Sequence, residues 1–192
     1  MRADRGKAGY TLVELMVTVS VVGILAGLSI VSFGRNWRAE RLKAAAGETT
    51  AWLDEARRLA IQKAKPCRIN IDRADLILSL KPNADNPEEF CPDSLYGPLE
   101  IRNTVLNSGA IVMCSSELEN GDPAQTSLSC SGSQSGSSSL IFTPRGTATT
   151  GILIKFHMPE AGADRCIAVM APLGQIRSGK TTATGCDFTT AY

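Results

Sequence analysis

Length, composition and charge limit the classes of protein that this sequence can encode. The chain has 192 residues, with 20 Lys and Arg against 19 Asp and Glu, and a formal net charge of +1. A near-neutral chain has no global field to steer it to a nucleic acid or an anionic surface, so any polyanion site has to be local. The length fits one modest globular domain and an anchor segment.

A long apolar run follows a short basic leader. Over Tyr10–Phe33, Glu14 is the only charged residue. At 1.5 Å per residue, this run makes a helix of roughly 36 Å, enough to cross a hydrocarbon core of roughly 30 Å. The basic residues Arg2, Arg5 and Lys7 favour a cytoplasmic N-terminus. The run therefore predicts a single-pass membrane anchor, with the rest of the chain exported.

Glu14 needs an explanation, because an acid inside a membrane helix costs about 2.5–3.5 kcal/mol on insertion scales. The run contains no Lys or Arg to pair with it. A cut after Gly9 would create an α-amino group at Tyr10, and this group could pair with Glu14 of the same chain or of a neighbouring one. The alternative is an ordinary secretory signal whose apolar region ends near Ala26-Gly27 and is removed.

Two glycines in the run, Gly23 and Gly27, form a small-xxx-small pair on one helix face. Such a pair lets another helix approach closely. The alternative is that glycine is simply frequent in membrane helices.

Residues 35–66 continue the helical pattern with a polar surface. Charged residues occupy most of one side, while apolar residues recur at helical spacing. These apolar residues are Leu42, Ala45, Trp52, Leu53, Ala56, Leu59 and Ala60. Pro66 ends the pattern, because it disfavours helix at the residue before it. We expect one helix from about residue 11 to 65, with a membrane or filament-core half at 10–34 and an amphipathic half at 35–66.

Residues 67–192 predict a β-rich head. Strand-like runs lie at 67–72, 75–80, 100–106, 110–114, 140–143, 152–158, 166–171 and 175–177, the first two forming a hairpin. The proline-rich stretch 81–98 predicts a loop. Residues 115–139 are rich in Ser and Gly and predict an exposed loop. A long helix followed by strands indicates an α+β protein, with the head sheet packed on the helix.

Six cysteines follow the anchor, and an even number on the exported side suggests disulfides. We expect pairing in chain order, between Cys67 and Cys91, Cys114 and Cys130, and Cys166 and Cys186. Each bridge would be worth about 3 kcal/mol in the chain-entropy model. Buried free thiols are the alternative. No Cys-x-x-Cys occurs, and the single His157 cannot complete a usual zinc site, so we expect no metal site.

No catalytic or cofactor site is expected either. Gly174 to Thr181 fits the letters of a phosphate-binding loop, but that loop needs a following helix, and residues 182–192 make a poor one. His157 lies in a strand pattern without a nucleophile motif nearby, so we expect no enzyme and no small-molecule substrate.

The segment Gly9-Tyr10-Thr11-Leu12-Val13-Glu14-Leu15, followed by Val22-Gly23-Ile24-Leu25-Ala26, resembles the prepilin signal of type IV pilins and type II secretion pseudopilins. The resemblance implies that a prepilin peptidase cuts after Gly9 and methylates the new N-terminus at Tyr10. It also implies that Glu14 pairs with a neighbour's N-terminus during filament assembly. Tyr10 stands where relatives more often have Phe.

The runs 141–146, 166–169 and 173–177 are similar to the head signature of GspH and FimT proteins, which are minor pseudopilins or minor pilins near a filament tip. FimT-type members bind DNA through a Gly-Arg-x-Arg run. The matching run here has Gln175 in place of the first arginine, which leaves Arg177 and nearby Lys180. Affinity for phosphates grows with the number of cations, so two cations alone predict weak binding.

Three functions follow from these resemblances. The first is a minor pseudopilin or minor type IV pilin, held in the bacterial inner membrane with its head in the periplasm, whose partners are other pilin subunits. The second is a DNA-binding minor pilin of an uptake pilus that uses Arg177 and Lys180. The third is a membrane-tethered periplasmic domain that never polymerises.

Overall fold

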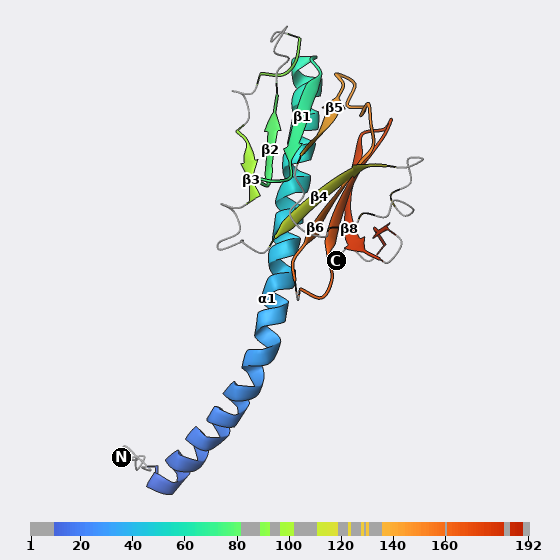
Figure 1. The fold of residues 1–192 in the computed structure, drawn as a ribbon. Coiled ribbons are helices and arrows are strands. Elements are labelled where there is room, and N and C mark those ends of the chain that lie inside the picture. Colours follow the sequence, from blue (N-terminus) through green and yellow to red (C-terminus); the bar gives the residue numbers. More distant parts are fainter. Residues whose placement is uncertain are drawn as a thin grey trace, which may run out of the picture. The chain divides into compact units, whose positions relative to one another are not determined.

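The structure is a computed structural model, and it describes residues 10–81, 89–92, 97–101, 111–118, 123, 128, 130, 136–159, 161–182 and 185–189, apart from the side chains of 28–36. The chain forms two compact units, Met1–Trp37 and Arg38–Tyr192. One helix, α1 (Leu12–Lys63), contributes to both. Figure 1 shows the course of the chain.

The predicted long helix is confirmed, and both of its ends have local causes. Thr11 caps the N-terminus, where its Oγ1 accepts a hydrogen bond of 3.2 Å from the Glu14 amide. At the other end, the amide of Ala64 donates to Ile61 O and that of Lys65 to Ala60 O. This is the bond pattern of a Schellman motif. Ala64 has a φ of 51°, a conformation in which glycine is more usual.

The α+β class is confirmed, but the strands form two antiparallel sheets. Sheet A has the order β3-β2-β1-β5 and sheet B the order β4-β6-β7-β8-β9. The strands of sheet A are β1 (Cys67–Asp72), β2 (Ile77–Leu80), β3 (Leu99–Glu100) and β5 (Ser137–Phe142). Those of sheet B are β4 (Val112–Glu117), β6 (Ile152–His157), β7 (Arg165–Met170), β8 (Gln175–Thr181) and β9 (Cys186–Asp187).

One hydrophobic core joins the C-terminal part of α1 to both sheets. The helix contributes the residues at its apolar spacing, among them Leu42, Leu53 and Ala56, each fully buried. Alternating residues of β1, such as Ile69 and Ile71, meet them from sheet A. Figure 1 shows β1 lying over this part of α1. The helical and strand periodicities of the sequence thus converge on a single core.

The expected exposed loop at 115–139 is shorter at both ends than the sequence predicted. Residues 115–117 belong to β4 and residues 137–139 to β5. Ser115 is only 5% exposed, and its hydroxyl lies 2.8 Å from that of Ser138. Since the two serines satisfy each other, they can be placed where sheet B meets sheet A. Most residues between them lie outside the described part of the chain.

Three other expected strands differ from the observed ones. The hairpin turn before β2 is longer, because Asp72 Oδ1 accepts hydrogen bonds from the amides of Ala74 and Asp75 and delays pairing until Ile77. The strand expected at 100–106 is observed only as β3, and residues 102–110 lie outside the described part. The strand expected at 175–177 continues to Thr181, because it pairs with β7 as far as Lys180 and with β9 at Lys180 and Thr181.

Candidate functional site

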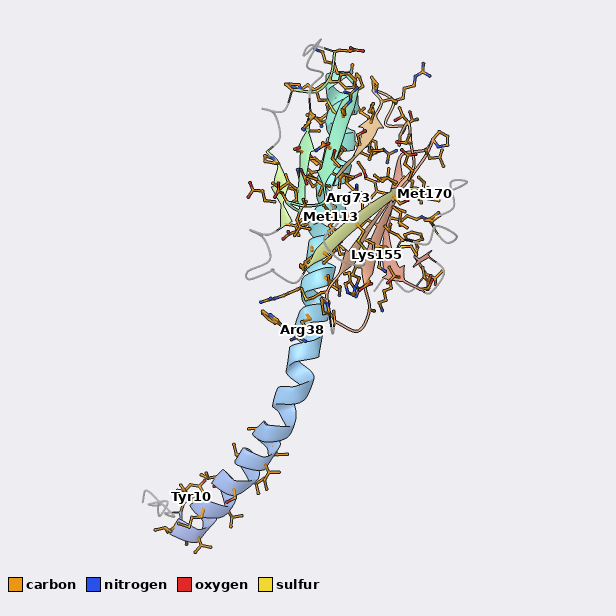
Figure 2. The ribbon with its side chains drawn as sticks, in the orientation of Figure 1. Tyr10, Arg38, Arg73, Met113, Lys155 and Met170 are labelled. Carbon is orange, nitrogen blue, oxygen red and sulfur yellow. A yellow bond between two sulfur atoms is a disulfide. The ribbon has the colours of Figure 1, made fainter. Side chains whose placement is uncertain are left out.

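The N-terminal turn of α1 contains the described residues of the predicted processing and assembly site. Gly9 lies outside the described residues. Tyr10 is 84% exposed and precedes the cap at Thr11, and Figure 2 marks it at the start of the helix. Glu14 is also exposed, at the third position of the helix. An acid in the first turn is favoured by the helix dipole, so Glu14 has a local structural role besides any role in assembly.

The helix beyond Glu14 exposes an unusually apolar surface. Ten large apolar side chains between Leu12 and Leu25 are described, and those named here are 50–70% exposed: Leu12, Val13, Leu15, Met16, Val17, Val19, Val21, Val22, Ile24 and Leu25. The hydroxyls of Thr18 and Ser20 donate to the helix carbonyls of Leu15 and Met16. Apolar surface on this scale indicates a partner, which is either protein or lipid.

Gly23 and Gly27 have open space beside them. A Cβ atom built on either glycine meets no atom within 4 Å. The two positions lie four residues apart and therefore share one helix face. Over the part of the chain that the structure describes, no helix combines the length and the apolar character that crossing a membrane requires.

Arg177 and Lys180 are not brought together. Both lie on β8, three residues apart, so their side chains leave opposite faces of the strand. Arg177 is exposed and pairs in register with Ala168, whereas Lys180 is half-buried and stands opposite Arg165. The two predicted cations therefore cannot hold one phosphate between them.

The segment that fits the letters of a phosphate-binding loop is mostly strand. Gly174 ends the turn before β8 with a φ of 65°, and residues 175–181 are β8 itself. The glycine-rich loop leading into a helix N-terminus, which cradles phosphates in such sites, is not present in this segment.

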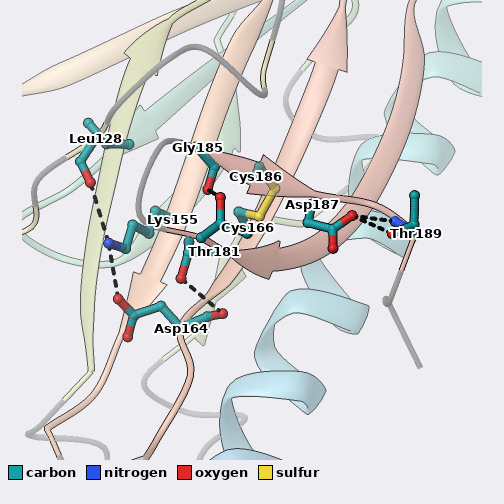
Figure 3. Close-up of a disulfide and its surroundings, with 10 residues drawn as sticks. Leu128, Lys155, Asp164, Cys166, Thr181, Gly185, Cys186, Asp187 and Thr189 are labelled. Carbon is teal, nitrogen blue, oxygen red and sulfur yellow. Dashed lines mark hydrogen bonds and ion pairs between the residues drawn. A yellow bond between two sulfur atoms is a disulfide. The ribbon is translucent and has the colours of Figure 1, made fainter.

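The three disulfides join Cys67 to Cys91, Cys114 to Cys130, and Cys166 to Cys186. These are the pairs predicted from the order of the cysteines. The third bridge ties β7 to β9, and Figure 3 shows it beside the side chain of Asp187, which caps Thr189 through its Oδ1.

A polar cluster around Asp164 was not anticipated from the sequence. Its carboxylate lies 3.0 Å from Lys155 Nζ and 2.7 Å from His157 Nδ1. Its backbone carbonyl accepts from the Thr181 amide and hydroxyl, and Lys155 Nζ also lies 3.4 Å from Leu128 O. Figure 3 shows Lys155 reaching both Asp164 and Leu128. Lys155 and His157 lie two residues apart on one face of β6, but the acid comes from the loop before β7, so no local pattern links the three residues.

The cluster has the geometry of a structural ion-pair network. Lys155 and Asp164 are only 17% and 18% exposed, so the pair is largely desolvated and depends on both members. Among the described residues, no group of three or more His, Cys, Asp and Glu side chains is placed to hold a metal ion.

Comparisons with known proteins concern the N-terminus and the fold. Residues 4–30 match the family model of the prokaryotic N-terminal methylation motif. No curated protein matches the chain. The fold is similar to that of the minor pseudopilin EpsH of the Vibrio cholerae type 2 secretion system, with a TM-score of 0.48 and 13% identity over 73% of this chain and 97% of that one.

The fold is also similar to two crystal forms of the type IV minor pilin FimU of Pseudomonas aeruginosa. One has a TM-score of 0.48 and 16% identity over 80% of this chain and 96% of that one. The other has a TM-score of 0.44 and 15% identity over 78% and 98% of the two chains. Tyr10 and Glu14 fall within the residues that match the prokaryotic N-terminal methylation motif.

Proposed function

We propose that this chain is a minor pseudopilin or minor type IV pilin, a structural subunit of a filament rather than an enzyme. The observation that carries the proposal is the methylation motif at residues 4–30, on a helix that exposes large apolar side chains from Leu12 to Leu25 and has Glu14 as the single charged residue of that stretch. In this role a prepilin peptidase cuts after Gly9 and methylates Tyr10. The inner membrane holds the segment at 10–34 until neighbouring subunits replace the lipid around it.

Glu14 supplies the selective contact in this proposal. Its carboxylate pairs with the N-terminal amine of a neighbouring subunit at a place where apolar side chains exclude water. An ion pair gains strength as water is removed, provided that both partners are present. A subunit without the acid would leave the neighbour's amine buried and unpaired, and burying an unpaired charge raises the free energy of the assembled filament.

The test compares Glu14→Gln with Thr11→Ala in the full chain, expressed with its own secretion or pilus machinery. Glu14→Gln removes the charge, and Thr11→Ala removes the helix cap but keeps the charge. We expect both variants to be cut after Gly9 and N-methylated, as read by mass spectrometry of the N-terminus. Only Glu14→Gln should lose incorporation into sheared filaments, by an order of magnitude or more, since leaving a buried charge unpaired costs about 3 kcal/mol or more.

Normal assembly of Glu14→Gln would exclude the pairing mechanism, and equal loss in Thr11→Ala would assign the effect to the helix end. An uncut wild-type chain would exclude prepilin processing altogether.

The DNA-receptor function has no comparable support. Arg177 and Lys180 point to opposite faces of β8, so only one of them can contact any single run of phosphates. We therefore keep the filament subunit as the proposed function.

A further inference from the structure

A groove of about 530 Å³ lies in the unit Arg38–Tyr192, between α1 and the last long strand of sheet B. Small residues form much of its helix wall, among them Ala46, Gly47 and Ala51. Strand β8 forms the opposite wall. A volume of this size is typical of ligand sites in proteins.

The β8 wall of the groove is a strand edge. Residues Gln175, Ile176, Ser178 and Gly179 all line the groove, and their positions alternate between the two faces of the strand. When residues from both faces of a strand line the same groove, the groove runs along the backbone edge of that strand. Within the described residues, β8 pairs with β7 from Gln175 to Lys180 but with β9 only at Lys180 and Thr181. Gly179 is buried beside the backbone of Asp187, so the part of the other edge that offers amides and carbonyls to an additional strand is 175–178.

The charges of the groove favour an acidic occupant. Lys43, Arg57 and Arg165 line it, against the single carboxylate of Asp54. Asp54 is already compensated by Arg58, outside the lining, at 2.7 Å. Arg57 donates to the carbonyls of Gly146 and Leu173, which orient its guanidinium without cancelling its charge.

Lys43 has only a weak partner in the same helix. Its Nζ lies 4.0 Å from Glu40, and both side chains are about half exposed or more. An ion pair of this kind contributes little, so Lys43 can turn to an incoming carboxylate at small cost.

We propose that this groove binds an extended acidic segment of a partner protein, which adds to the free edge of β8 as a strand. The backbone ladder would supply affinity, and the cations of the groove would select acidic side chains. The inference goes beyond the proposed function, because it concerns only the unit Arg38–Tyr192 and requires neither processing nor polymerisation. A nucleic acid strand would also be attracted to the basic side chains of the groove, but it cannot form a β-ladder with the backbone of β8.

Gly47 provides a clean way to fill the groove. A Cβ atom added there meets nothing within 4 Å, so a larger side chain begins in open space. Gly47→Leu would fill the groove, and Gly47→Ala is the matched control that gains the same helix propensity with little added bulk. Lys43→Glu reverses one charge of the lining, and Lys63→Glu makes the same change on α1 outside it.

The experiment measures fluorescence anisotropy of a labelled heptapeptide of alternating valine and glutamate, bound by the full chain in detergent micelles. A twin peptide with glutamine for glutamate and a single-stranded oligothymidylate are the other probes. We expect the acidic peptide to bind and to slow amide hydrogen exchange over residues 175–178. Gly47→Leu should abolish binding, and Lys43→Glu should weaken it on the order of threefold, the size of one partly exposed charge pair.

Equal binding of the glutamine twin, or unchanged binding by Gly47→Leu, would overturn the proposal. So would failure of the acidic peptide to bind at low salt. Binding of oligothymidylate that displaces the peptide would assign the groove to nucleic acid instead. Neither Gly47 nor Lys43 is needed for processing after Gly9. A negative result in the peptide experiment therefore leaves the proposed filament function standing, and a negative result for filament assembly leaves the peptide-binding proposal standing.

Discussion

Ala64 ends α1 in a left-handed conformation that glycine adopts more easily. Its φ is 51°, and its amide and that of Lys65 make the two hydrogen bonds that close the helix. A residue with a Cβ atom is strained in this region by roughly 1–2 kcal/mol. The helix nevertheless ends here because Pro66 follows, and no sequence pattern other than that proline marks the position.

Ala64→Gly should therefore stabilise the protein. We expect the free energy of unfolding to rise by about 0.5–1 kcal/mol, since relief of the strained φ outweighs the extra freedom of glycine in the unfolded chain. Denaturant unfolding followed by circular dichroism measures the change. Ala44→Gly, at an exposed helix-interior position, should lower the same quantity by about 1 kcal/mol. A destabilised Ala64→Gly variant would show that the strain is absent.

The carboxylate of Asp164 holds two basic side chains in a largely desolvated place. Asp164→Ala would leave Lys155 without its partner at a residue that is 17% exposed. We expect a loss of about 2–3 kcal/mol in the free energy of unfolding, near the lower end for a buried pair. Asp54→Ala removes the exposed pair with Arg58 and should cost less than about 1 kcal/mol. Equal losses in the two variants would contradict the difference in burial.

At the scale of elements, the turn between β7 and β8 is fixed by its contact with the loop after β5. Gly174 is buried with a φ of 65°, and a Cβ atom there would collide with the carbonyl of Gly146. Arg57 of α1 donates to the same carbonyl at 2.7 Å and to that of Leu173 at 3.3 Å. The runs 141–146 and 173–177, which stand apart in the sequence, therefore meet at one corner.

Gly174→Ala should destabilise this corner by roughly 3 kcal/mol or more, because a strained φ and a backbone collision add together. Gly162→Ala is the matched control. Its φ is 87°, but an added Cβ meets nothing within 4 Å. It should cost only the conformational part, about 1–2 kcal/mol. Thermal unfolding of both variants with the disulfides intact separates the two contributions, and indistinguishable values would argue against the collision.

The element boundaries show where sequence patterns were sufficient. The strand β1 and the ends of α1 followed from alternation, from helical spacing and from Pro66. The extension of β8 to Thr181 did not, because Ser178-Gly179-Lys180-Thr181 has no apolar alternation and is held by pairing with β7. The serines of β4 and β5 were predicted to lie in a loop. The hydrogen bond between the hydroxyls of Ser115 and Ser138 joins two distant segments, so no local sequence pattern indicates it.

At the scale of the whole molecule, the chain divides into two compact units of different composition. The unit Arg38–Tyr192 contains the core, both sheets and the three disulfides. The other unit contains residues 12–25, whose large apolar side chains are all exposed. A core of its own is the property that lets a domain fold independently.

The fragment 38–192 should therefore fold without the N-terminal unit. We expect a monomer in detergent-free buffer, with the three disulfides formed and a cooperative unfolding transition, because the core does not draw on residues 12–25. Light scattering after gel filtration, with mass spectrometry of the disulfides, makes the test. The full chain should require detergent to remain monomeric. An aggregated or unfolded fragment would show that the head depends on the N-terminal unit.

The sequence by itself determined the motif at the N-terminus, the long helix and the α+β class. These features are encoded locally, in a short motif and in helical and strand spacing, whereas an even number of cysteines suggests disulfides without fixing which cysteines pair. Tertiary structure alone decided that the strands divide into two sheets, that Asp164 joins Lys155 and His157, and that Arg177 and Lys180 point apart. It also placed the free edge of β8 beside α1. Each of these depends on which distant segments pair, and the free energy of pairing lies in contacts that no single segment contains.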